Sequence, residues 1–132
     1  MILDKDKPQP AKQDRNSLSM YYILKGKEII PCNDIKIWAA TCAKNDIAKT
    51  QIFDSFVSTI FLGINHNFDD TKKPLLFETM IFGGERDGLQ ERFTTYDEAL
   101  NRHNEIVSEL KSKLNIFQKI VYLIQNFTAI SR

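Results

Sequence analysis

The middle of the chain alternates apolar runs with short polar segments, a pattern typical of β-strands joined by tight turns. The runs 56–62 and 75–82 are apolar almost without interruption, which predicts central strands buried on both faces. An Asn-His-Asn loop at 65–67 follows the first run, and the glycine-rich segment 83–88 predicts a chain reversal after the second. Strands are predicted over 21–24, 28–30, 47–53, 56–62, 75–82 and 89–94. We therefore expect an antiparallel meander sheet of about five or six strands.

One short helix is predicted between the second and third strands. Pro31 ends the preceding strand, and either Asn33 or Asp34 can cap a helix. The apolar residues that follow have helical spacing, and they are Ile35, Trp38, Ala39 and Cys42. We expect this helix to lie on the sheet with Trp38 facing inward.

A long helix is predicted at the C-terminal end. Thr95 and Glu98 match a capping box, so the helix should begin at about residue 96. Its apolar positions alternate in steps of three and four, and they include Val107, Leu110, Leu114, Phe117, Val121 and Ile124. If Asn115 does not break it, the helix would be roughly 45 Å long, more than a domain of this size can cover. The favoured interpretation is self-association through this helix, and the alternative is one helix, or two shorter ones, folded back on the chain's own sheet.

The length of 132 residues allows one hydrophobic core but not two. Residues 1–18 are polar, contain two prolines and show no helix or strand period, so we expect a flexible tail there. Residues 19–132 are then a single α+β domain with a helical extension from about 96.

Charge and cysteine content narrow the setting. The 18 basic and 17 acidic residues give a net charge of +1, which disfavours binding to duplex nucleic acid. No apolar run of about 18 residues is present, and charged residues directly follow Leu3, so neither a membrane span nor a signal peptide is predicted. Cys32 and Cys42 form no CxxC pair and are expected to be free thiols in a reducing compartment. We expect a cytoplasmic protein.

Glu78 is the first candidate for a functional side chain. A carboxylate between apolar residues is costly to bury unless it is paired, and Arg92 on the next strand is the obvious partner if the register places both on one face. A structural ion pair, or a glutamate that faces water, is the commoner outcome for such a residue. The alternative is a pair that orients a ligand.

The two histidines occupy different settings. His66 lies in the loop after the first central strand, a good position for contact with a ligand. A metal site of His66, Asp69 and Asp70 would need a further ligand that no HxH or HExxH spacing supplies, so we predict no metal. His103 falls on the apolar side of the last helix, where a hydrogen-bonded interface histidine is commoner than a catalyst.

Three arginines lie near the glycine-rich turn and the start of the last helix, namely Arg86, Arg92 and Arg102. Guanidinium groups and backbone N–H groups could together hold phosphate there. Neither GxxxxGK[ST] nor GxGxxG is present, and neither cysteine has a histidine nearby in the sequence, so nucleophilic catalysis is poorly supported.

Three strings together resemble a family of small proteins encoded by tailed phages and prophages: FVSTIFLGINHNF at 56–68, PLLFETMIFGG at 74–84 and RFTTYDEALNRH at 92–103. The resemblance spans roughly residues 21–106. The pattern is also similar to the phage anti-defence proteins that sequester the cyclic ADP-ribose signal of the Thoeris system. That resemblance implies a small, non-enzymatic oligomer that holds a nucleotide between its subunits.

The leading hypothesis is therefore a non-catalytic phage or prophage protein that sequesters a small phosphorylated nucleotide at a site between subunits. Its candidate ligand-binding residues are Arg92, Glu78, His66, Arg102, His103 and Arg86. The arginines would bind phosphate, Glu78 would fix an arginine or a ribose hydroxyl, and the histidines would line the mouth. One alternative is an inhibitor that binds a host enzyme through the apolar C-terminal helix. Another is a hydrolase of such a signal that uses His66 or His103 with Glu78.

Overall fold

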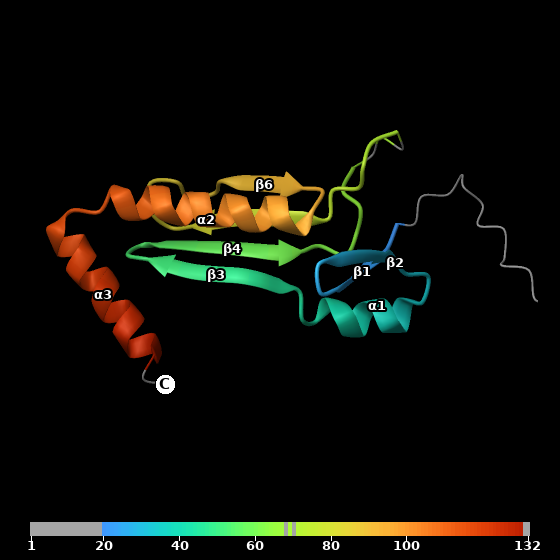
Figure 1. The fold of residues 1–132 in the computed structure, drawn as a ribbon, viewed down its shortest axis with the longest axis horizontal. Helices are drawn as coiled ribbons and strands as arrows, with labels where there is room; N and C mark the ends of the chain where they lie inside the picture. Colours follow the sequence, from blue (N-terminus) through green and yellow to red (C-terminus); the bar gives the residue numbers. More distant parts are fainter. Residues whose placement is uncertain (1–19, 68, 70, 131–132) are drawn as a thin grey trace, which may run out of the picture.

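The computed structural model describes residues 20–67, 69 and 71–130, so the tail predicted over residues 1–18 lies outside them. It confirms the α+β class, with antiparallel strands and a helical C-terminal end (Figure 1). The elements in the described residues are β1 (Tyr22–Lys25), β2 (Glu28–Pro31), α1 (Ile35–Cys42), β3 (Asp46–Ile52), β4 (Ser55–Phe61), β5 (Phe77–Phe82), β6 (Gln90–Phe93), α2 (Tyr96–Ser112) and α3 (Ile116–Ile130).

The strands form two sheets, where the sequence predicted one meander. β1 and β2 make a separate hairpin, and the larger sheet has the order β3-β4-β5-β6. The hairpin joins the end of β4 through a bridge between Tyr21 and Ile64 and a 2.8 Å hydrogen bond from the Tyr22 N–H to the Gly63 carbonyl. Gly63 has φ +73°, a conformation that lets the chain leave the line of β4. The bend at Gly63 therefore separates the hairpin from the larger sheet.

α1 packs against this hairpin, where the sequence had placed it on the main sheet. The Asp34 carboxylate caps it by accepting hydrogen bonds from the N–H groups of Lys36 and Ile37. The Trp38 side chain points toward the hairpin, donates to the Gly63 carbonyl at 2.9 Å and meets the Tyr21 ring edge-on. No residue of α1 is fully buried, because the hairpin is too small to cover it.

The main core lies between α2 and one face of the four-stranded sheet, called the inner face below (Figure 1). Its two clusters of buried side chains are Tyr22, Phe61, Leu76, Phe77 and Ala99, and Ile52, Val57, Ile81, Ile106 and Leu110. β4 alternates between buried and half-buried residues, which corrects the expectation that it is buried on both faces. Its half-buried residues belong to the opposite face, called the open face below, where Phe82 of β5 is exposed.

The C-terminal helical segment breaks at Asn115, one of the two outcomes left open by the sequence. α2 begins at the predicted cap, where the Glu98 N–H donates to the Thr95 hydroxyl. α3 begins with a second capping box, in which the side chains of Asn115 and Gln118 each accept the other's backbone N–H. α3 then turns away from α2 across the β3–β4 end of the sheet (Figure 1). In the part of the chain that the structure describes, every helix is too short or too polar to cross a bilayer.

Candidate functional site

The predicted site residues do not converge on one site. The structure places Glu78 and Arg92 on the open face, His103 in the core, His66 in the loop after β4, and Arg86 and Arg102 in a network of ion pairs beside α2. The burial and the charged neighbours differ between these locations, and so does the ability of each to bind a ligand.

The Glu78–Arg92 pair forms as predicted, because the β5–β6 register places the two residues directly opposite each other. The Arg92 Nε donates to Glu78 Oε2 at 3.0 Å, and the Gln90 amide donates to the same oxygen at 2.5 Å. Glu78 is only 7% exposed although its face is open, because Arg92 and Gln90 lie over it. Burial with two donors fixes the carboxylate, which in turn orients the guanidinium.

This pair retains unused hydrogen-bonding capacity. Within the described residues, only Nε of Arg92 and only Oε2 of Glu78 have partners. The two terminal nitrogens of Arg92 can therefore donate to an anion, while Glu78 Oε1 can accept from a hydroxyl group. A sugar phosphate offers both groups within a few ångströms of each other.

His103 is not available to a ligand, and its assignment to the mouth of a site is wrong. It is 1% exposed, and both ring nitrogens are bonded, Nδ1 to the Thr59 hydroxyl at 2.8 Å and Nε2 to the Thr50 hydroxyl at 2.9 Å. The Thr59 hydroxyl also bonds to that of Thr79 at 2.7 Å. Burial lowers the pKa of His103, which favours its neutral form. His103 is thus the centre of a polar network inside the core.

The sheet separates His103 from Glu78. Residues opposite each other in an antiparallel pair share a face and consecutive residues alternate, so Glu78 lies on the open face while Thr79 lies on the inner face. His103 bonds to Thr59, which is the partner of Thr79 across the β4–β5 ladder. A hydrolase in which Glu78 and His103 act on the same substrate atom is therefore incompatible with this fold.

Arg102 is saturated by carboxylates, and Arg86 is paired with one of the same carboxylates. Arg102 makes a two-pronged bond to Glu91, at 2.7 and 3.1 Å, and lies 3.5 Å from Glu109. Arg86 bonds to the same Glu109 at 2.7 Å. Arg102 lowers the pKa of Glu91, and Arg86 lowers the pKa of Glu109. All three nitrogens of Arg102 have carboxylate partners, so the structure does not support it as a phosphate ligand. Arg86 is bonded through one nitrogen to Glu109 of α2, so it does not join Arg92 on the open face.

His66 lies in a loop that asparagine side chains hold in shape. The Asn65 carboxamide oxygen accepts from the N–H groups of Asn67 and Leu75, and the His66 N–H donates to the Leu75 carbonyl at 3.2 Å. The half-buried His66 is therefore held near the start of β5. Asp69 accepts from Thr71, while Asp70 lies outside the described residues. No group of three side chains suited to a metal ion occurs in the described part of the chain.

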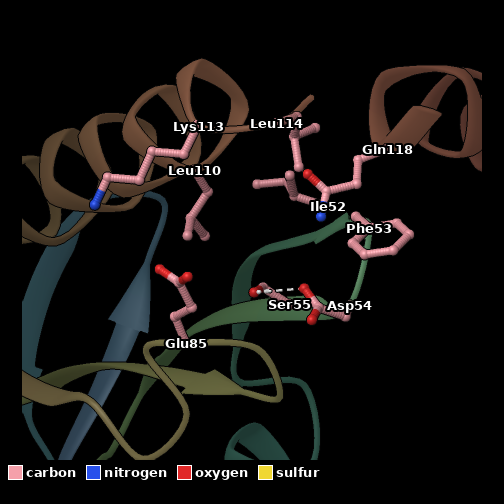
Figure 2. A pocket seen from close by; sticks show the side chains of 9 residues that line it. All are labelled: Ile52, Phe53, Asp54, Ser55, Glu85, Leu110, Lys113, Leu114 and Gln118. Carbon is pink, nitrogen blue, oxygen red and sulfur yellow. Dashed lines mark hydrogen bonds between the residues drawn. The ribbon is translucent and has the colours of Figure 1, made fainter. Parts of the chain in front are cut away.

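A small cavity at the opposite end of the sheet was not predicted. Figure 2 shows it between the β3–β4 turn, Glu85 and the junction of α2 with α3. Its volume of about 170 Å³ is below the ~300 Å³ at which small-molecule sites begin. Ile52 and Leu110 provide apolar wall, and the charged lining residues are Asp54, Glu85 and Lys113. Four segments of the chain meet there, so no local sequence pattern marks it, and a nucleotide does not fit.

α3 carries the most exposed apolar surface among the described residues. Its six large exposed side chains are Ile116, Phe117, Ile120, Leu123, Ile124 and Phe127. Sequence analysis singled out this segment, but it placed Phe117 and Ile124 in one seam with Leu110, which the structure buries elsewhere. Contiguous apolar surface of this kind marks sites of protein contact.

Comparisons with protein-family models, with curated proteins and with solved structures give no match, so the functional argument depends on the residues themselves.

Proposed function

We propose that this chain is a non-catalytic binding protein that sequesters a small phosphorylated ligand on the open face of its four-stranded sheet. The observation that supports the proposal best is Arg92, a guanidinium that a buried carboxylate orients and whose two terminal nitrogens have no partner among the described residues. The phage or prophage setting, the anti-defence role and a nucleotide of the cyclic ADP-ribose type as ligand are suggested by the sequence resemblance alone. The cytoplasmic location is suggested by the free cysteines and by the absence of a predicted span or signal peptide.

The ligand contacts follow from the free atoms of the pair. Phosphate oxygens would accept from the terminal nitrogens of Arg92, and a ribose hydroxyl would donate to Glu78 Oε1. His66 is near the same end of the sheet, because its loop pairs with Leu75, two residues before β5. The proposed ligand set is thereby reduced to Arg92, Glu78 and His66, with Gln90 helping to hold the Glu78 carboxylate.

The shape of this region favours a site shared between subunits. The pair lies on an exposed sheet face, and the cavity near α3 lies at the other end of the sheet. Tight sites bury most of the surface of a small ligand. One open sheet face cannot do so, and a second protein surface, other than the exposed face of α3 at the far end of the sheet, would have to cover the ligand.

The first experiment is thermal unfolding of the purified protein with and without cyclic ADP-ribose derivatives, cyclic nucleotides and ADP-ribose. A ligand present at about 100 times its dissociation constant stabilises the folded state by about 2.7 kcal/mol, a shift that is readily measured. The Arg92→Ala variant should lose the shift. The Lys49→Ala variant removes another cation from the open face and should keep it.

Mass spectrometry of the small molecules released by denaturation would identify a ligand that co-purifies. An intact phosphorylated molecule in the wild-type extract, absent from the Arg92→Ala extract, is the expected result. An empty extract together with no thermal shift for any of these compounds would refute sequestration. A converted product would instead support a signal-degrading enzyme that uses His66 and Glu78.

The six exposed apolar side chains of α3 favour a second candidate function, inhibition of a host enzyme through this helix. This alternative requires α3 to be accessible in the purified protein. Its test is co-purification of a host protein at a fixed ratio from infected cells, and loss of that protein when Ile120 is replaced by glutamate.

A further inference from the structure

α3 turns two polar residues, Gln118 and Gln125, toward its own domain and most of its large apolar side chains toward solvent. Gln125 donates to the Phe53 carbonyl at 3.1 Å, and Tyr122 packs on the core cluster around Ile52. The six outward side chains, called the outer stripe below, are Ile116, Phe117, Ile120, Leu123, Ile124 and Phe127, and they are 51% to 80% exposed. Most of the large apolar side chains of α3 are therefore not used in its packing on the domain.

The outer stripe has the geometry of a buried helix face. At 3.6 residues per turn its six side chains fall within an arc of about 120°, close to the stripe that a helix normally turns toward a core. Lys119 and Asn126 flank it on one side and Thr128 on the other. Lys119 is the one charged residue of α3. Such a polar border around an apolar centre is the usual anatomy of a protein interface.

The area of the stripe is sufficient for a stable contact. Six side chains of these types and exposures present on the order of 800 Å², which is about what each partner buries in a standard interface. The same area in water would be well above the largest patches usual for a monomer, ~300–600 Å².

We infer that the outer stripe is the interface between two copies of this chain, packed α3 against α3 about a twofold axis. A second copy presents the same stripe, equal in area and in apolar character, and it is present wherever the chain is made. The outer stripe carries no charge that would call for an oppositely charged partner. Residues 1–19 of the same chain are mostly polar and do not match it.

The contact is made by the helix and not by the neighbouring sheet edge. β3 is an edge strand beside α3, so pairing of β3 with its copy would be the other route to a dimer. Its register is interrupted by a bulge between Asp46 and Ala48, and it carries Lys49. Both features are ones by which proteins discourage edge-to-edge pairing.

The test is the mass of the full chain in solution, measured by size-exclusion chromatography with light scattering over concentrations up to about 100 µM. The wild type should have twice the mass of one chain. The Ile120→Glu variant places a carboxylate in the centre of the contact and should weaken association by about 100-fold or more. The milder Leu123→Ala should weaken it by about tenfold with folding unaffected.

The matched control is Ile37→Glu on α1, because Ile37 is 53% exposed and Ile120 is 51% exposed. This variant should remain a dimer. A monomeric wild type, an equal effect of Ile37→Glu and Ile120→Glu, or a monomer bound to a host protein through α3 would each overturn the inference. Arg92→Ala should stay dimeric whether or not the ligand proposal holds, so the two proposals fail independently.

Discussion

The buried network around His103 makes stability depend on pH, and this dependence can be worked out from the structure. The folded state holds the imidazole at 1% exposure between two threonine hydroxyls, and burial lowers its pKa below the ordinary value of 6.5. The unfolded chain then binds a proton more readily than the folded chain. The contribution of the neutral His103 to the free energy of unfolding is fully present above about pH 6.5 and is lost as the pH falls below this value.

The magnitude follows from linkage. Between the unfolded and folded pKa values, one proton of difference changes the free energy of unfolding by up to 1.36 kcal/mol per pH unit. Linkage therefore sets an upper limit of about 2 kcal/mol on the loss between pH 6.5 and 5. Glu91 and Glu109 have pKa values that arginines lower, so their effect on the pH dependence of stability falls mainly below pH 4.5, the ordinary pKa of a glutamate. Their contribution is therefore small between pH 6.5 and 5.

Urea unfolding at several pH values between 7.5 and 5 measures this effect, with wild type, His103→Gln and His66→Gln compared. At pH 7.5, His103→Gln should be less stable by about 1–3 kcal/mol, since a threonine hydroxyl loses its buried partner. Its stability should then change less than that of wild type as the pH falls, whereas His66→Gln should follow wild type. A flat wild-type profile, or equal slopes for wild type and His103→Gln, would refute the assignment of a buried neutral imidazole.

Three further substitutions, one of them with a matched control, test other parts of the structure. Gly83→Ala should destabilise the fold by about 2 kcal/mol or more, because its φ is +81° and a Cβ would collide with the Asp54 carbonyl oxygen. The control Gly88→Ala, at φ +85° with open space around it, should cost only about 1 kcal/mol. Equal melting temperatures for the two variants would contradict this account. Arg102→Ala should cost about 1 kcal/mol at low salt and less at high salt, since its carboxylate partners are partly exposed, and a salt-independent loss in denaturant melts would argue against an ionic role. Glu78→Ala should cost about 1–2 kcal/mol by chemical denaturation through two lost charge-assisted hydrogen bonds, and no loss would mean that the pair contributes nothing to stability.

Local rules in the sequence determined the elements of this protein. The turn at Gly83, the caps at Thr95 and at Asp34, and the apolar strands are encoded within a few residues, because hydrogen bonds of turns and caps join near neighbours in the chain. The Glu78–Arg92 pair could also be predicted from the sequence, since a short glycine-rich connection between two strands restricts their register. Even the break at Asn115 has a local cause, the capping box with Gln118.

Only the tertiary structure decided what the long polar side chains and the last helix contact. His103 meets threonines that are 44 and 53 residues away, so no spacing could place it in the core or exclude it from a ligand site. The partners of Arg102 come from β6 as well as from its own helix, and they turn a candidate phosphate ligand into part of an ion-pair network. The direction of α3 depends on the chain turning at Asn115, which points an apolar stripe outward. Periodicity alone left open whether a second copy or the chain's own sheet covers this stripe. Periodicity identifies the apolar face of a helix, whereas the surface that covers this face depends on contacts between distant parts of the chain, or between chains.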